Sequence, residues 1–143
     1  MTFSAAFSQG LEIMVYVASK SEEEKGQYLS IPKISEAFNI PTSTVKYIIS
    51  LLKKKDLISS KTGVSGGLSI RKKPSEISLY DIFVAIEGEG SVFKIHTDFD
   101  LKYFETPGAE KWLEKGVEIL HRSETAMLSV LKNTALTELI LPE

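Results

Sequence analysis

Cationic side chains are concentrated between Lys46 and Lys73. This stretch has eight lysines and arginines against the single acid Asp56, a net charge of +7, whereas the remaining residues carry a net charge of −9. A basic stretch on an otherwise acidic chain is typical of a surface that binds phosphate groups, because solvated surfaces normally mix both signs. A solvated run of charges without a ligand is the alternative.

Other residue types that support chemistry are sparse. The chain contains no cysteine and only two histidines, His96 and His121, which stand apart without metal-ligand spacing. Thiolate metal sites, cysteine-held iron–sulfur clusters and cysteine nucleophiles are therefore excluded, and no other nucleophile motif is present. We predict that the protein is not an enzyme and has no catalytic residue, metal ligand or cofactor.

Length and composition indicate one main globular domain. The chain has 143 residues, of which 43% are hydrophobic and 25% charged, and these are ordinary values for a soluble protein. No run approaches the roughly 18 apolar residues that a membrane span requires, and the first residues, MTFSAAFSQG, lack the features of a signal peptide. We expect a cytoplasmic protein without a membrane partner.

We expect three helices in the first part of the chain, the third of which carries the first part of the basic stretch. Apolar residues recur at helical spacing in residues 10–20, and the sequence SIP at Ser30 is typical of a helix start, which predicts a second helix over residues 31–38. After a break at NIP, we expect Thr42 to cap a third helix that ends at Lys55. Two helices joined by so short a turn indicate a helix-turn-helix.

The third helix has one apolar face and one polar face. Val45, Ile48, Ile49 and Leu52 recur at the spacing of a buried stripe, and short polar groups, a phenol and lysines lie opposite. Such side chains can reach base edges and phosphates in a major groove, although simple solvent exposure is the alternative. We predict DNA contacts from this helix by Thr42, Ser43, Thr44, Lys46, Tyr47, Ser50 and Lys54.

The stretch KTGVSGGLSIRKK, residues 61–73, follows the third helix. Residues 57–61 and 68–72 can pair as antiparallel strands around the glycine-rich loop 62–67. A nucleotide-type phosphate loop is excluded, because Leu68 and a strand pattern follow the last glycine instead of a lysine, a hydroxyl residue and a helix. The pattern predicts a β-wing behind the helix-turn-helix, with DNA contacts from Lys61, Ser65, Gly66, Arg71 and Lys72.

Apolar residues recur every three or four positions between residues 110 and 140, which predicts a long C-terminal helix. This helix can pack on the first helix or on a second copy. We favour a homodimer, because helix-turn-helix proteins usually bind two half-sites as twofold dimers. The predicted domains are a winged helix-turn-helix DNA-binding domain, 1–90, and a connecting segment with a dimerisation helix, 91–143. The predicted dimer interface contains Leu113, Val117, Leu120, Met127 and Leu131.

The order of these motifs resembles one known family over nearly the whole chain. SIPKISEAFNIPTSTVKYIISLLKKKDLISS is shared by many folds, but GVSGGLSIRKKPSEISLYDIFVAIEG is similar to the wing and following helix of the Rrf-two family of bacterial transcription regulators, the family of IscR, NsrR and CymR. The resemblance implies a mainly α protein with a small β-wing and a long C-terminal dimerisation helix. It also implies a dimeric repressor or activator that binds a partly palindromic operator in double-stranded DNA, and we take repression as the expectation.

The chain departs from the family pattern in several places, among them the missing cysteines, the wing and the first helix, which has Ser8 and Gln9 where basic residues are common. Several cluster-binding members carry three cysteines after the helix that matches LYDIFVAIEG, whereas the corresponding EGSVFKIHTDFDLKYF has none. We therefore expect a member without an iron–sulfur cluster. Many members also place an arginine before the first wing glycine, where this chain has Thr62, which puts one phosphate or minor-groove contact in doubt.

Two further points stay open. The aromatic-rich region from Phe93 to Phe104 can belong to the core or line a pocket for an effector, so a small-molecule effector and a regulatory protein both remain candidate partners. A winged-helix protein-interaction module that does not read DNA sequence is the alternative function. The salt dependence of binding distinguishes the two functions, because only a complex that neutralises phosphates weakens steeply with ionic strength.

Overall fold

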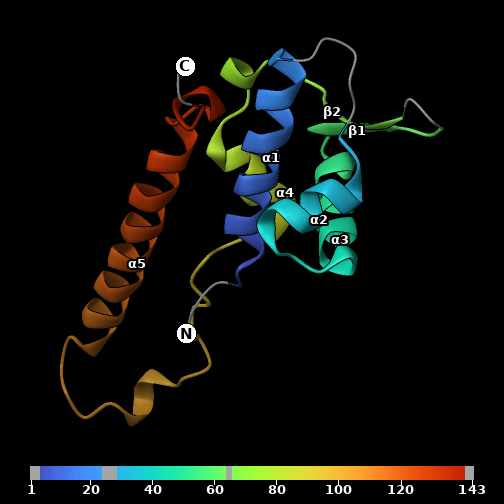
Figure 1. Cartoon of the computed structure of the whole chain (residues 1–143). Helices are drawn as coiled ribbons and strands as arrows, with labels where there is room; N and C mark the ends of the chain where they lie inside the picture. Colours follow the sequence, from blue (N-terminus) through green and yellow to red (C-terminus); the bar gives the residue numbers. More distant parts are fainter. Residues whose placement is uncertain (1–3, 24–28, 64–65, 141–143) are drawn as a thin grey trace. The chain divides into compact units, whose positions relative to one another are not determined.

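The computed structural model of the chain describes residues 4–23, 29–63 and 66–140. Among the described residues, its main elements are two strands and five helices (Figure 1). In chain order they are α1 (Ala6–Glu23), α2 (Ile31–Phe38), α3 (Thr42–Lys54), β1 (Ile58–Lys61), β2 (Gly67–Ile70), α4 (Leu79–Glu87) and α5 (Ala109–Lys132). Short 3-10 turns lie before α4, before α5 and after α5. The predicted fold class, mainly helical with a small β-wing, is confirmed.

The elements form two compact units. The first unit lies within residues 1–88 and 131–143, and the second unit is residues 89–130. The predicted domains, 1–90 and 91–143, assign the last residues differently from this division, because the chain beyond Leu131 clusters with the first unit. Each unit is described by itself below.

Helix α2 begins and ends as its sequence indicates. Ser30 is the N-cap and its hydroxyl accepts a hydrogen bond from the Lys33 N–H at 3.4 Å, while Pro32 occupies the first turn. Asn39 adopts a left-handed conformation, with φ of 52°, and ends the helix. The predicted bounds of this helix, 31–38, are correct.

The start of α3 differs from the prediction. Thr42 is not its cap, because Pro41 already occupies the N-cap position and Thr42 is the first helical residue. The Thr42 hydroxyl instead donates to the hydroxyl of Ser35 at 3.3 Å, which ties α3 to α2. The helix also ends one residue earlier than predicted, because the backbone of Asp56 reverses the chain with φ of 55°.

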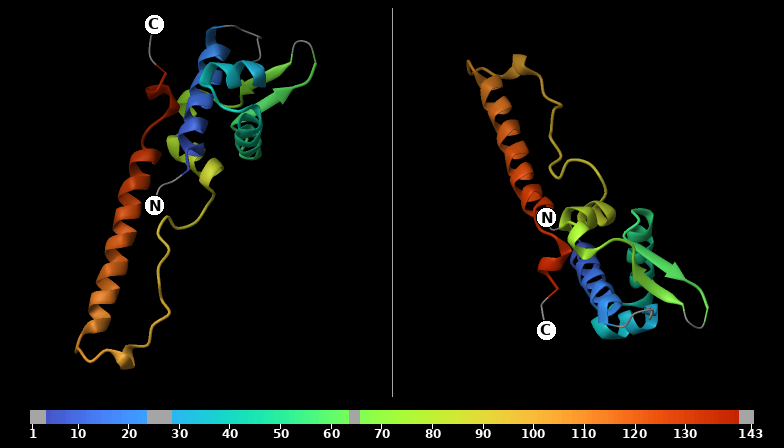
Figure 2. Two further views of the ribbon diagram at one scale, coloured as in Figure 1. Left: turned by 60° about the horizontal axis from the view of Figure 1, so that its bottom comes forward. Right: turned by 90° about the horizontal axis from the view of Figure 1, so that it is seen from above.

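Strands β1 and β2 pair antiparallel, with Ile58 opposite Ile70 at the base and Lys61 opposite Gly67 toward the tip. The predicted strands, 57–61 and 68–72, are each displaced, because the N–H of Leu57 closes the end of α3 and Arg71 and Lys72 lie in a bend. Figure 2 shows the hairpin extending away from the helices of the first unit.

The core of the first unit is built from helices α1 to α4, the base of the hairpin and a C-terminal segment. Its fully buried side chains are Ile13, Met14, Val17, Ile34, Val45, Ile48, Leu52, Leu57, Ile77, Ile82 and Leu136.

Helix α4 starts with a capping box in which Ser78 and Asp81 exchange hydrogen bonds. Helix α1 is longer at both ends than the predicted 10–20.

The C-terminal segment explains why the long helix is shorter than predicted. Helix α5 ends at Lys132, and the segment that follows bonds to the start of α4: the Leu79 N–H donates to the Thr134 carbonyl and the Leu136 N–H to the Ile77 carbonyl. Leu136 is fully buried there. The apolar residues up to residue 140 therefore belong partly to a core segment and not to one continuous helix.

The second unit contains a connecting segment, residues 89–108, and most of α5. Figures 1 and 2 show the segment running beside the helix, and the Val92 N–H donates to the carboxylate of Glu124. Among the helices that the structure describes, none is long and apolar enough to cross a membrane.

Candidate nucleic-acid interface

Helix α3 presents a polar face to solvent. Its apolar stripe, Val45, Ile48, Ile49 and Leu52, is at most 4% exposed, which confirms the predicted helix phase. The opposite face is exposed, and Tyr47 is 60% exposed in spite of its aromatic ring. The exposed residues on and beside this face are Thr42, Ser43, Lys46, Tyr47, Ser50 and Lys54, whereas Thr44 is half-buried.

Two hydroxyl groups on α3 already form hydrogen bonds within the first unit, which limits the hydrogen bonds they can form with a ligand. The Ser50 hydroxyl donates to the carbonyl of Tyr47 at 2.6 Å, so its remaining capacity toward a ligand is to accept. The Thr42 hydroxyl is engaged with Ser35. Neither group is as available as Ser43, at the exposed N-terminal end of the helix.

A lysine joins α3 to the hairpin. The ammonium group of Lys53 donates to the Ser60 hydroxyl on β1 at 2.7 Å. At the base of the hairpin, the backbone N–H of Arg71 donates to the Leu57 carbonyl. These contacts fix the wing against the helix that carries the polar face.

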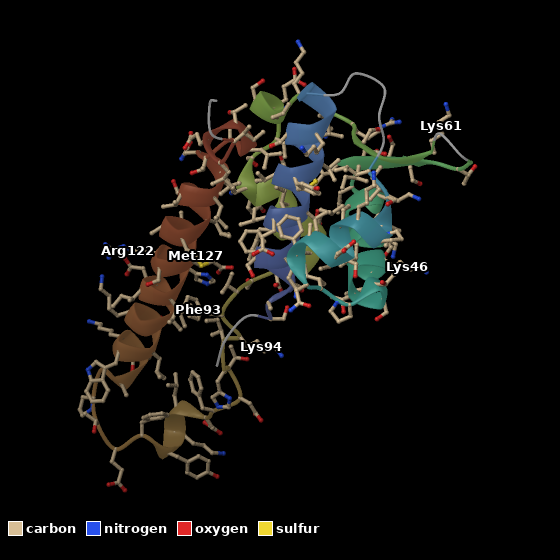
Figure 3. All side chains as sticks on the ribbon, viewed as in Figure 1. Lys46, Lys61, Phe93, Lys94, Arg122 and Met127 are labelled. Atoms are coloured by element: carbon tan, nitrogen blue, oxygen red, sulfur yellow. The ribbon has the colours of Figure 1, made fainter. Side chains whose placement is uncertain are left out.

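A cleft of about 470 Å³ lies where α2, α3 and the hairpin meet. Four predicted site residues, Thr42, Lys46, Lys61 and Gly66, line it together. Figure 3 shows Lys46 and Lys61 on the side of the first unit from which the hairpin projects. The cleft therefore places cationic side chains from α3 and from the wing around one concave surface.

The start of α2 also lines this cleft, and the sequence prediction did not include it. The residues concerned are Ser30, Ile31 and Pro32. They reach the wing because Leu29 pairs with Leu68 through two backbone hydrogen bonds, of 2.8 and 3.3 Å. The N-terminus of a helix attracts anions through its free N–H groups and its dipole. The helix-start signal at Ser30 could have indicated that a helix N-terminus lies near the basic residues.

The wing tip depends on glycine at two positions. Gly63 has φ of 106°, a conformation that side chains disfavour. At Gly66, a Cβ atom would lie 2.1 Å from the Lys61 carbonyl oxygen, so the chain can approach itself only without a side chain. The predicted contact residue Ser65 lies outside the described residues. Arg71 and Lys72 are exposed at the base of the hairpin and do not line the cleft.

The predicted dimer residues on α5 are half-buried within their own chain. This holds for Leu113, Val117, Leu120, Met127 and Leu131. A second stripe, displaced by one position and repeating every four and three residues, is exposed instead: Trp112, Gly116, Ile119, Ser123, Ala126 and Val130. A four-three repeat is the spacing of a coiled-coil seam.

A helix-turn-helix followed by a two-stranded wing with exposed cations defines a winged-helix architecture. The model of the Rrf2 family, described as an iron-dependent transcriptional regulator, matches residues 3–142. The chain therefore belongs to the Rrf2 family of transcriptional regulators, as its motifs indicated. The proteins that it resembles are regulators and not enzymes, which agrees with the sequence prediction.

Two curated relatives carry names of HTH-type transcriptional regulators. YffB of Lactococcus lactis subsp. lactis (strain IL1403) is 31% identical over 94 residues, which are 66% of this chain and 58% of the relative. YwnA of Bacillus subtilis (strain 168) is 36% identical over 63 residues, which are 44% of this chain and 47% of the relative. The chain thus matches about half the length of these relatives.

Solved structures share the fold over almost the full chain. CymR (YrzC), the global cysteine regulator of B. subtilis, has a TM-score of 0.72 and 24% identity, with 98% of this chain and 96% of that chain covered. The oxidized form of Staphylococcus aureus CymR has a TM-score of 0.68 and 28% identity, with 100% and 98% covered. IscR of T. potens has a TM-score of 0.66 and 21% identity, with 98% and 86% covered.

The residues of this chain do not fit an iron–sulfur cluster, although the family description refers to iron. Clusters are held mainly by cysteine thiolates, and the sequence has no cysteine. In residues 4–23, 29–63 and 66–140, no three His, Asp or Glu side chains are grouped so that they could hold a metal ion. No step below depends on iron.

Proposed function

We propose that this chain is a sequence-specific transcription regulator that binds a partly palindromic operator in double-stranded DNA. In this proposal it binds as a homodimer and represses transcription of the genes next to the operator. The family supports DNA-binding regulation in general. The observation that carries the specific proposal is the exposed polar face of α3 beside a cleft with cations from two elements.

In this proposal α3 enters the major groove. Ser43 and Tyr47, both exposed on its outer face, reach base edges, since the N-terminal half of a recognition helix lies deepest in the groove. Lys54, the last residue of the helix, contacts the phosphate backbone. Base contacts supply sequence preference and phosphate contacts supply affinity.

The cleft binds a backbone phosphate in the same complex. Lys46 and Lys61 supply positive charge, and the N-terminal end of the α2 dipole adds to it. Gly66 lets the phosphate approach the wing backbone. Arg71 and Lys72, at the base of the hairpin, contact a different part of the backbone, because they do not line the cleft.

The homodimer is formed through α5. We place the centre of its seam on the exposed stripe that contains Trp112 and Ile119, flanked by the half-buried stripe that contains Leu120 and Met127. Small side chains on the exposed stripe, such as Gly116, let two helices approach closely. A twofold dimer presents two α3 helices, which matches an operator with two related half-sites.

Selection of duplexes from a random pool tests the proposal. The protein is expected to enrich a motif with two inverted half-sites, and Tyr47→Ala is expected to change the enriched bases. Enrichment of no motif would leave only non-specific binding and would support a protein-interaction module instead. The position of the motif relative to promoters in the genome then tests repression, which requires overlap with polymerase binding.

A further inference from the structure

The second unit contains a cavity of about 410 Å³ between the connecting segment and the first turns of α5. This volume falls in the range of small-molecule sites. The connecting segment contributes His96, Thr97, Phe99 and Leu101, and α5 contributes Glu110, Leu113, Glu114 and Val117. All of these residues belong to one unit, so the cavity is defined without reference to the first unit.

The acidic side chains on the cavity wall outnumber the basic ones, since His96 is the one basic group among the lining residues. Glu110 and Glu114 line it, and none of the lining residues is a lysine or arginine. Neither carboxylate forms an ion pair or hydrogen bond with another described residue, whereas Glu118, one turn further along α5, pairs with Lys115 at 3.1 Å. Two carboxylates at positions i and i+4 of a helix repel each other, so a cation between them relieves an unfavourable contact.

The rest of the wall is mostly carbon and includes an aromatic ring. Phe99 is 41% exposed, and Phe104 holds it edge-on with ring centroids 6.2 Å apart. Leu101, Leu113 and Val117 supply aliphatic surface. An aromatic face attracts an organic cation through its quadrupole, and an apolar wall favours a ligand with a hydrophobic body.

A bare metal ion fits this wall poorly. Magnesium and calcium require about six oxygen ligands. The wall offers the two carboxylates and the Thr97 hydroxyl among mostly apolar side chains, and no described residues form a group of three metal-ligating carboxylates or imidazoles. The same carboxylates disfavour an anionic ligand.

We propose that this cavity binds a small organic cation with an apolar body, with the carboxylates of Glu110 and Glu114 beside its ammonium group and the Phe99 ring against its body or charge. The proposal does not rest on DNA binding, because the cavity and the methyl groups that report on it both lie in the second unit.

The test is a titration of the full chain followed by NMR of the Leu113 and Val117 methyl groups. The probes are benzylamine, which is cationic at neutral pH, benzyl alcohol, which is neutral, and benzoate, which is anionic. Benzylamine is expected to give saturable shifts at these methyl groups and to bind about tenfold tighter than benzyl alcohol, with benzoate weakest. Equal binding of amine and alcohol, or the absence of saturable shifts with the amine, would overturn the proposal.

Matched variants locate the site. The double variant Glu110→Gln, Glu114→Gln is expected to lose the preference for benzylamine over benzyl alcohol, whereas Glu118→Gln, outside the cavity, is expected to keep it. Phe99→Leu removes the ring but keeps both carboxylates. This variant should therefore bind benzylamine more weakly but still prefer benzylamine to benzoate. Spectra of the free variants verify that each is folded, and unchanged benzylamine binding in a folded double variant would contradict the proposed site.

Discussion

Tyr47 has the side chain on which the proposed sequence preference depends most. It is 60% exposed in the middle of α3, so most of its surface is left in contact with solvent. We expect Tyr47→Ala to weaken binding to the selected operator by about 1–3 kcal/mol, with little effect on a scrambled duplex, because it removes a base contact. Fluorescence anisotropy with both duplexes measures this difference. Tyr103→Ala, at a 77% exposed tyrosine in the second unit, is the control.

At Gly66 the backbone geometry of the wing leaves no room for a side chain. A Cβ atom there would lie 2.1 Å from the Lys61 carbonyl oxygen, well inside any real contact. We expect Gly66→Ala to change the amide NMR shifts of the hairpin and to weaken binding to every duplex, while the core of the first unit stays folded. Thr62→Ala, at a neighbouring exposed residue, should leave the hairpin shifts beyond its own neighbours unchanged. A Gly66→Ala spectrum that matches the parent would show that the described tip is wrong.

Helix α5 gives a prediction that separates its two stripes. Ile119 is 48% exposed, whereas Leu120 is half-buried within its own chain. We expect Ile119→Asp to convert a homodimer to a folded monomer, because it places a carboxylate in an apolar seam without a partner. Leu120→Asp is expected to lower the free energy of unfolding as well.

Light scattering for mass and circular dichroism for helix content measure these two effects. A parent protein that is monomeric would remove the basis for a seam on α5. If Leu120→Asp separated the subunits with full helix content and Ile119→Asp did not, the seam would be centred on the half-buried stripe, as the sequence alone suggested.

Elements whose signals are local could be predicted from the sequence, and those that depend on distant contacts could not. The bounds of α2 and the buried stripe of α3 follow from capping and periodicity within one helix. The cleft includes the start of α2 because Leu29 pairs with Leu68, which no local pattern shows. Thr42 was assigned as a cap because of its hydroxyl, but proline at the preceding position occupies that role.

At the scale of the whole molecule, the C-terminal segment stabilises the first unit. Leu136 is fully buried in the core of the first unit, although it follows the long helix in sequence. We expect Leu136→Ala to lower the free energy of unfolding by about 2–5 kcal/mol, because it leaves a cavity in that core. Leu139→Ala, at a residue 38% exposed, should cost less than about 1 kcal/mol. Urea denaturation of both variants measures the difference, and equal costs would contradict the described packing.

Titration of the selected operator and of a scrambled duplex across salt concentration tests the central claim most directly. The account predicts that the operator binds at least about 10³-fold tighter at physiological salt. It also predicts that the logarithm of both affinities falls linearly with the logarithm of salt, by about 0.9 for each phosphate contacted, and that Lys46→Ala reduces this slope by about one. Equal affinity for the two duplexes, or binding that does not change with salt, would contradict the account.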